Sequence, residues 1–153
     1  MSTQFPPPAA APPPSSPGLG PSGPRAGFWV RFGAWLIDII IVGIVIGVLE
    51  LILKVPGEII GFLLAVAYYT FFEGGPTGQT IGKRALGIRV YDFTRGGPIG
   101  YPRGLGRYFA QILSAIPCYL GYFWMIWDKE KQCWHDKLVT CVVVPVSVYP
   151  VER

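Results

Sequence analysis

The chain has 153 residues, of which 51% are apolar and only 14% charged, and its mean hydropathy is +0.42. This composition is typical of a membrane protein, and it excludes a largely disordered chain because too much apolar surface would stay in water. Three scattered cysteines exclude a disulfide scaffold. In a membrane protein, the formal charge of +4 indicates contact with anionic lipid headgroups rather than binding of nucleic acid.

Residues 1–26 differ in composition from the rest of the chain. They hold nine of the sixteen prolines together with many Ala, Ser and Gly residues, and Arg25 is their only charged side chain. We expect a disordered, partly polyproline II tail, because such a segment has no apolar face to bury. A secretory signal peptide is not expected, since the start lacks a continuous apolar stretch. A membrane domain is predicted at 27–148, followed by a short tail at 149–153.

Two apolar segments predict an antiparallel helical hairpin in the membrane. Residues 32–53 would reach about 33 Å as a helix, enough to cross a hydrocarbon core of roughly 30 Å. A turn containing Pro56 follows, and a second helix at 56–72 returns through the bilayer. The basic loop at 73–107 is expected on the cytoplasmic side, which places the N-terminus there as well. The chain is therefore predicted to be a multi-pass protein of the plasma membrane.

A third apolar helix is predicted at about 108–127, where twenty consecutive residues carry no charge. Its length suits a full crossing of the bilayer. However, Pro117 and Gly121 interrupt it, and the distribution of Lys and Arg along the chain favours a segment that re-enters on one side. We expect a break near Pro117, and both spanning and re-entry remain open.

Two short segments, one on each side of the third helix, predict β-strands. Residues 86–92 alternate between apolar and other side chains, and residues 138–148 are rich in β-branched side chains but too short to cross as a helix. Re-entry of the third helix would leave both strands on one side, where they could pair. The predicted class is thus an all-α membrane protein with a helical hairpin, a third apolar helix and a short possible β pair.

Arg31 and Asp38 are the main candidate site residues of the first helix. An Asp at the centre of a membrane helix costs about 2.5 to 3.5 kcal/mol, so Asp38 needs a partner or a hydrated surface. Their spacing of seven residues puts both side chains on one face of the helix, about 10 Å apart along its axis. A structural charge at the membrane surface and a functional ion or solute site both fit this pattern.

Other residues are assigned to helix packing or to the membrane surface. Gly43 and Gly47 have the small-xxx-small spacing that lets two membrane helices approach closely. Glu50 precedes a lysine by four residues, a favourable helical ion pair, and is interpreted as an interfacial anchor rather than a transport site. Lys83 and Arg84 are predicted to face lipid phosphates, because the surrounding GQTIGKR lacks the spacing of a phosphate-binding loop.

A polar cluster near the C-terminus contains His135 and Asp136. His135 is the only histidine and therefore the simplest candidate for a response to pH near neutrality. Asp136 could equally cap a helix or turn. Cys133 and Cys141 lie nearby, but structural metal sites usually draw paired ligands from two arms, so no metal is expected. The sequence assembles neither a catalytic set nor a dinucleotide motif, so neither an enzyme nor a cofactor is expected.

Three motifs together resemble the RDD family, which is named for one arginine and two aspartates. They are AGFWVRFGAWLID at 26–38, GQTIGKRALGIRVYD at 78–92 and WHDKLVTCVVV at 134–144. By this resemblance the arginine corresponds to Arg31 and the aspartates to Asp38 and Asp136. It implies a prokaryotic integral membrane protein with a suggested role in transport of unestablished ligands, although fold membership does not fix function. Where the family often reads Ala-Gly-Thr after its His-Asp pair, this chain has Leu-Val-Thr at 138–140.

Two functions from different classes fit the sequence. In the first, the chain is a transport or permeation unit for an ion or small solute, in which Arg31, Asp38 and Asp136 line a polar path. Two or more copies would then associate, because three helices enclose little lumen. In the second, the chain is a membrane-anchored interaction or assembly protein that contacts another membrane protein. The same three residues would then only tie the basic loop and the C-terminal segment to the first helix.

Overall fold

The computed structural model describes residues 23–117 and 120–151. Most of the predicted disordered tail at 1–26 lies outside the described residues, as do the last two residues of the predicted C-terminal tail. The described part begins in contact with the fold. The Ala26 N–H donates a hydrogen bond to Val143 O (2.9 Å), and the Gly23 N–H donates one to the Tyr149 hydroxyl (2.6 Å).

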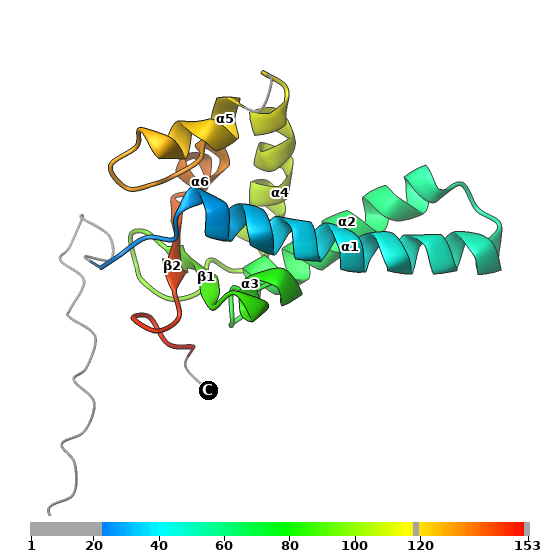
Figure 1. The fold of residues 1–153 in the computed structure, drawn as a ribbon, viewed down its shortest axis with the longest axis horizontal. Coiled ribbons are helices and arrows are strands. Elements are labelled where there is room, and N and C mark those ends of the chain that lie inside the picture. Colours follow the sequence, from blue (N-terminus) through cyan, green and yellow to red (C-terminus); the bar gives the residue numbers. More distant parts are fainter. Residues whose placement is uncertain (1–22, 118–119, 152–153) are drawn as a thin grey trace, which may run out of the picture.

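Two long helices form a hairpin that projects from a lobe made mainly of residues 75–117 and 120–151 (Figure 1). Helix α1 covers Phe28–Leu53 and begins four residues before the predicted start, and α2 covers Gly57–Gly74. At the end of α1, Lys54 adopts a left-handed conformation (φ 54°). Its N–H donates to the carbonyl of Glu50 at 3.0 Å, which closes the helix before the turn. Both helices thus lie where the hydropathy pattern predicts them.

Helix α1 has the length and composition of a membrane span. It has 26 residues, and most of its large apolar side chains are exposed, as lipid contact requires. Among the described residues, α1 is the one continuous helix that meets both requirements. Helix α2 has 18 residues and carries Glu58 and Glu73 near its ends. The second crossing therefore remains a prediction.

The third apolar segment, predicted over about 108–127 with a break near Pro117, is a bent pair of helices. Helix α4 covers Tyr101–Ala115 and begins earlier than predicted, because Pro102 is well tolerated in a first helical turn. Helix α5 (Leu120–Phe123) and the 3-10 helix η1 (Trp124–Ile126) follow, and the two parts meet at 109°. The predicted break near Pro117 is confirmed. Proline has no N–H to continue the helical ladder, so a break there is expected.

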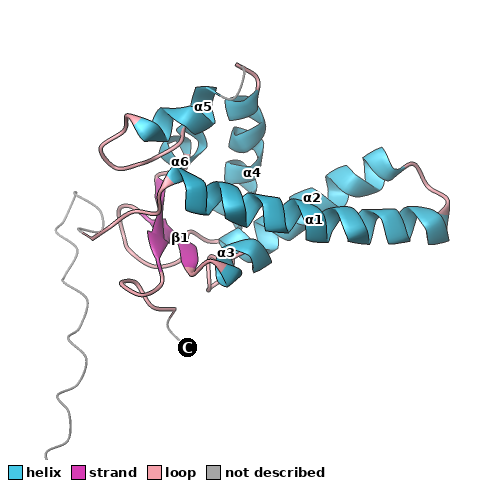
Figure 2. Ribbon diagram, viewed as in Figure 1, coloured by secondary structure: helices cyan, strands magenta, loops and turns pink. Residues whose placement is uncertain are grey.

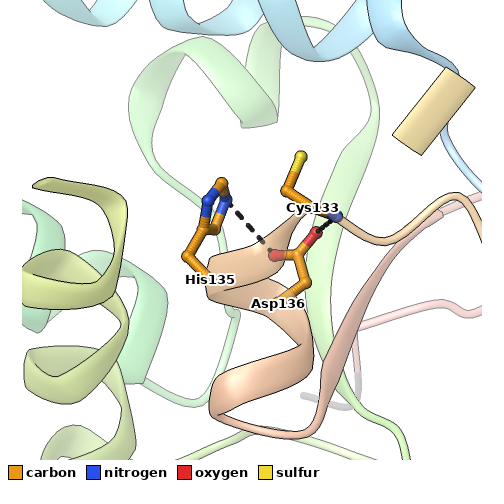
Figure 3. A group of neighbouring side chains, drawn as sticks. All are labelled: Cys133, His135 and Asp136. Carbon is orange, nitrogen blue, oxygen red and sulfur yellow. Dashed lines mark hydrogen bonds and ion pairs between the residues drawn. The ribbon is translucent and has the colours of Figure 1, made fainter. Parts of the chain in front are cut away.

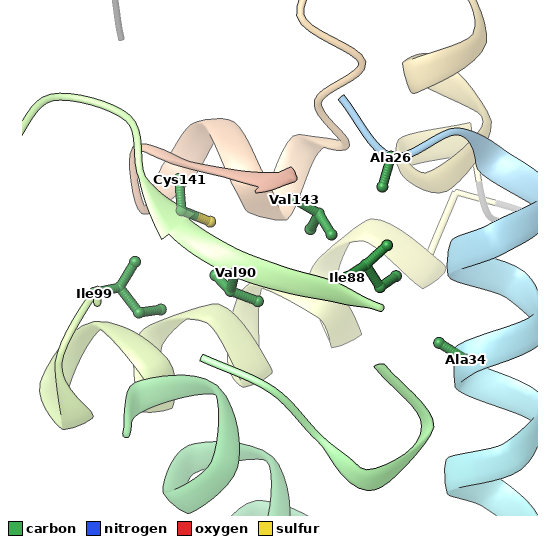
Figure 4. Packing of buried hydrophobic residues seen from close by; sticks show 7 residues of the cluster. All are labelled: Ala26, Ala34, Ile88, Val90, Ile99, Cys141 and Val143. Carbon is green, nitrogen blue, oxygen red and sulfur yellow. The ribbon is translucent and has the colours of Figure 1, made fainter. Parts of the chain in front are cut away.

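The two predicted strands pair with each other. Strands β1 (Ile88–Asp92) and β2 (Cys141–Pro145) form an antiparallel sheet in which Val90 lies opposite Val143 (Figure 2). Both faces of β2 are buried, which explains its continuous run of apolar residues. Side chains on one face join the end of the hairpin to the lobe (Figure 4). This cluster consists of Ala26, Ala34, Ile88, Val90, Ile99, Cys141 and Val143.

Two short helices complete the lobe and carry side chains of the candidate site. Helix α3 covers Ile81–Ala85 and packs on α1, and α6 covers Trp134–Leu138 and packs on α4. The Thr80 hydroxyl caps α3. Asp136 caps α6, because its Oδ2 accepts the backbone N–H of Cys133 at 3.1 Å. The predicted capping role of Asp136 is thus confirmed.

The contact between α3 and α1 requires a residue without a side chain at Gly82. A Cβ placed there would lie 2.1 Å from Ala34 O and 2.9 Å from Asp38 Oδ1. We therefore expect Gly82→Ala to lower the free energy of unfolding by about 1 to 3 kcal/mol or more, the usual cost of overpacking, in denaturant unfolding in detergent. Gly106→Ala is the matched control, because its Cβ would meet only Val139, at 3.7 Å. Equal destabilisation by both variants would contradict this packing.

Candidate functional site

Asp38 is fully buried where α1 meets α2 and α3. Its Oδ1 accepts hydrogen bonds from the Tyr68 hydroxyl and the Gly82 N–H, both at 2.7 Å. Its Oδ2 accepts a hydrogen bond from the Thr80 hydroxyl at 2.6 Å. A buried carboxylate is tolerated only when its oxygens are paired in this way. The structure therefore supplies the partners that the sequence requires for Asp38, and all three are neutral donors.

A second buried network, the ion-pair chain, joins five charged side chains. In order along the network these are Arg31, Asp136, Arg107, Glu73 and Lys83. Arg31 Nη1 lies 2.5 Å from Asp136 Oδ2, and Arg107 Nη2 lies 2.6 Å from Asp136 Oδ1. Glu73 binds Arg107 through one carboxylate oxygen and Lys83 through the other. The members come from α1, α6, α4, α2 and α3. The ion-pair chain therefore connects the hairpin to α3, α4 and α6 of the lobe.

The three residues singled out by the RDD resemblance do not form one cluster. Arg31 and Asp136, 105 residues apart in sequence, bind each other directly. Asp38 belongs to the separate network around the start of α3. Arg31 and Asp38 nevertheless line the same cavity, as their spacing on one helix face predicts. The predicted triad is therefore one ion pair and one separately held carboxylate.

Sequence reasoning missed Glu73 and Arg107 as site residues. Glu73 follows an apolar run, and a charge at a helix end is usually solvated. Arg107 was one of several cations in the predicted basic loop. A signal for Arg107 was available: Gly104, Arg107, Ala110 and Ser114 recur at helical spacing and form the buried face of α4. Three of these are small residues, which leaves room beside the helix for one long side chain.

Lys83 does not face lipid phosphates, contrary to the prediction. It is buried and binds Glu73, whereas Arg84 is exposed as predicted for a cation at the membrane surface. Successive residues on a helix point about 100° apart, so adjacent cations on α3 can have opposite environments. Lys83 is therefore reassigned from the surface to the site.

The predicted packing residues of α1 have no neighbour within the described chain. Nothing lies within 4 Å of a Cβ built at Gly43 or Gly47. Helices α1 and α2 approach instead at Gly61, where an added Cβ would meet an α1 side chain at 3.2 Å. The Glu50 carboxylate lies over Gly57 at the start of α2, and no ion pair with the lysine four residues later is formed among the described residues. The open glycine face is thus available to a neighbour outside this chain.

Cys133, His135 and Asp136 lie together at the start of α6 (Figure 3). Their potential ligand atoms are within 4.8 Å of one another, a spacing compatible with a metal ion. The local charge opposes a cation, because both oxygens of Asp136 already bind guanidinium groups. Burial raises the pKa of Cys133 and of Cys141 to about 12, so both thiols stay protonated. The arrangement therefore favours capping and packing over metal binding.

The pKa values of Asp136 and His135 are both lowered, for different reasons. Burial alone would raise the pKa of Asp136, but the guanidinium groups of Arg107 and Arg31 hold it well below its ordinary value. Burial lowers the pKa of His135 to about 3, so its imidazole is neutral at physiological pH. The His135 imidazole of the folded protein therefore does not change its charge near neutrality, and its effect on pH dependence comes through unfolding.

A cavity of about 320 Å³ lies between the hairpin and the lobe. Partly exposed aromatic side chains form what we call its aromatic entrance: Phe28, Phe32, Trp35 and Phe123. Largely buried charged side chains form its charged floor: Arg31, Asp38, Glu73, Lys83 and Arg107. The volume falls at the small end of the roughly 300 to 1,000 Å³ typical of small-molecule sites. The cavity lining therefore combines partly exposed aromatic rings with largely buried charged groups and with buried apolar side chains such as Met125 and Val143.

The sequence matches the family model of the RDD family over residues 25–140, a range that includes both buried networks. The chain belongs to the RDD family. The resemblance read from the sequence motifs is thus confirmed. A helix long and apolar enough to cross a membrane agrees with the membrane association typical of RDD proteins.

Relatives of this RDD chain occur in mycobacteria and in Bacillus. It is 35% identical over 96 residues to a proline-rich antigen homolog of Mycobacterium tuberculosis, which covers 59% of this chain and 40% of that protein. It is 33% identical over 88 residues to the proline-rich antigen of Mycobacterium leprae, and the match covers 56% of this chain and 35% of that protein. It is 31% identical over 147 residues to the uncharacterized protein YxaI of Bacillus subtilis, and the match covers 78% of this chain and 96% of that protein. The chain spans less than half the length of the mycobacterial relatives, and no solved structure matches it.

Asp136 compensates two buried arginines, so removal of its charge should be costly. We expect Asp136→Asn to lower the free energy of unfolding by about 3 to 5 kcal/mol, because Arg31 and one side of Arg107 lose their counter-charge. Denaturant unfolding in detergent measures the loss. Glu130→Gln is the control: Glu130 pairs with Arg25 and its side chain is 41% exposed, so less than about 1 kcal/mol is expected. Similar small losses in both variants would argue against a structural role for the ion-pair chain.

The lowered pKa of His135 predicts a pH dependence of stability. The unfolded chain takes up a proton at His135 near pH 6.5, whereas the folded chain does so only near pH 3. Between these values the unfolded state binds more protons, so the free energy of unfolding falls as the pH is lowered. We expect wild type to lose on the order of 2 kcal/mol more than His135→Gln between pH 7 and pH 4.5, measured by unfolding at each pH. Parallel curves for the two proteins would contradict this assignment.

Proposed function

We propose that this RDD protein is a transport or permeation unit of the plasma membrane, in which the cavity at the base of the hairpin binds an ion or small solute. The observation that carries the proposal is the union of an aromatic entrance and a charged floor in one cavity. Small-molecule sites are typically concave and largely apolar, with a few polar groups placed to orient the ligand. No catalytic activity is part of this proposal.

The pairing of the strands supports a definite topology for this unit. Strand β1 precedes the third apolar segment and β2 follows it, so their pairing brings both ends of that segment to the same end of the hairpin. The ion pair between Arg31 and Asp136 does the same. A full crossing would separate these ends by the thickness of the bilayer, so re-entry is favoured. The N-terminus, the basic loop and the C-terminal segment then share the cytoplasmic side.

The shape of the hairpin supports an assembly of more than one copy. Only a small part of α1 is buried within the chain, so the described residues enclose no path across the bilayer. A second copy, or another membrane protein, would have to complete it. The open face at Gly43 and Gly47 suits such an association, because small residues let membrane helices approach closely.

A membrane-anchored interaction or assembly protein is the second candidate. One observation favours it: both oxygens of Asp38 and both oxygens of Asp136 already accept hydrogen bonds within the fold. Under this alternative, these carboxylates and Arg31 hold the lobe on the hairpin and carry no solute. The two candidates differ in whether an occupied cavity matters for flux.

A variant that fills the cavity separates the two candidates. Gln111 of α4 lines the cavity, whereas the next residue, Ile112, is exposed. For purified protein in liposomes, we expect Gln111→Phe to abolish most protein-dependent solute entry and Ile112→Phe to preserve it. Light scattering after iso-osmotic addition of glycerol, urea, potassium chloride or sodium acetate measures this entry as vesicle swelling.

The unfolding temperature of each variant shows whether it is folded. If no solute enters wild-type liposomes faster than protein-free liposomes, the transport proposal is overturned and the anchored role is favoured. Equal loss of entry in the two folded variants would show that the solute does not pass through this cavity.

A further inference from the structure

We propose that the cavity binds a single-chain, monoanionic amphiphile drawn from the bilayer, with its carboxylate on Lys83 and its alkyl chain in the aromatic entrance. This inference rests on the proposed function in naming the ligand class of the same cavity. It concerns binding and not flux, so it can fail while transport stands, or hold where transport fails.

The first argument is a charge imbalance within the ion-pair chain. The ion-pair chain contains three cations, Arg31, Arg107 and Lys83. It contains only two carboxylates, Glu73 and Asp136. The remaining acid of the charged floor is held by hydroxyl groups and a backbone N–H in its own network. Buried charge without a counter-charge is costly. The ion-pair chain by itself therefore carries one positive charge in excess, which one bound anion would pair, whereas the buried charges including Asp38 number three of each sign.

The second argument identifies Lys83 as the donor for that anion. Arg107 uses all three of its guanidinium nitrogens on Asp136 and Glu73. Arg31 also uses all three, on Asp136 and two backbone carbonyls, so no guanidinium edge is free for a two-pronged contact with a carboxylate, although each arginine keeps two single N–H donors. An ammonium group has three N–H donors, and within the described structure that of Lys83 makes one hydrogen bond, to Glu73. The Lys83 side chain is only 11% exposed and lines the cavity, so its other donors lie in a site that excludes most water.

The third argument is the apolar surface that a small inorganic anion would leave uncovered. Phe28 stacks on Phe32 and on Phe123, with ring centroids 6.0 and 5.5 Å apart, and Phe32 stacks on Trp35 at 5.7 Å. These residues of α1 occupy its first turns, where the helix enters the bilayer. An alkyl chain would cover this surface, and an anionic headgroup, unlike that of a neutral alcohol, would add a charge-assisted hydrogen bond to the Lys83 ammonium. The small volume of the cavity suits one short chain better than a two-chain phospholipid.

A pair of brominated probes tests this assignment on the full chain in detergent. 8-Bromooctanoate and 8-bromooctan-1-ol share a chain and differ in headgroup charge, and bromine quenches tryptophan fluorescence on contact. Trp35 is the tryptophan among the described cavity-lining residues, so quenching lost in Trp35→Phe reports on the cavity. We expect saturable quenching of Trp35 by the acid at a concentration at least about tenfold lower than by the alcohol.

Matched variants show which residue recognises the charge. Lys83→Met should remove the preference for the acid, and Lys83→Arg should retain it. Arg84→Met, which removes an adjacent but exposed charge from the same helix, should also retain it. If Lys83→Met fails to fold, the affinities of wild type for the acid and the alcohol still test whether the cavity prefers an anionic headgroup.

Three results would overturn the proposal. They are equal affinity for the two probes, quenching that is unchanged in Trp35→Phe, and a preference for the acid that survives in folded Lys83→Met. Competition by sodium acetate as effective as that by unbrominated octanoate would show that a free anion, with no alkyl chain, is the ligand.

Discussion

The structure depends on one constraint, which is that charge placed out of water must be matched within the fold. Three cations and three carboxylates lie buried where the hairpin meets the lobe, and each is bound by groups from another element. The individual ion pairs are not a source of net stability, because desolvation offsets much of their attraction. In this arrangement of α1, α2, α3, α4 and α6, each of these groups has at least one partner among the described residues.

This constraint also separates roles that the family signature groups together. Asp38 holds the start of α3 through neutral donors, and Arg31 holds α6 through Asp136. Their shared cavity is also lined by Lys83, whose ammonium makes one hydrogen bond among the described residues, to Glu73. The signature residues are therefore those that build the cavity, while a lysine outside the signature is the group most able to bind what enters it.

The sequence predicts the elements better than it predicts the site. The two long helices, the break near Pro117 and both strands follow from hydropathy, proline chemistry and β-branched composition, which act locally. The partners of the buried charges do not, because Glu73, Arg107 and Lys83 read as surface charges in a one-dimensional pattern. The family resemblance identified Arg31 and Asp136 as candidate site residues. Their direct contact depends on the pairing of two strands that lie some fifty residues apart in sequence. Such pairing becomes visible only when the chain is folded.

The separation of 105 residues between Arg31 and Asp136 bears on the order in which the protein is made. At a synthesis rate of roughly 5 to 20 residues per second, the ribosome needs about 5 to 20 seconds to travel from one to the other. During that interval Arg31 exists without Asp136, whereas Arg107 already has Glu73 as one carboxylate partner and gains its second only with Asp136. Final closure therefore waits for the last helix and strand. A chain truncated before residue 136 would lack this contact, and with it the partner strand of β1.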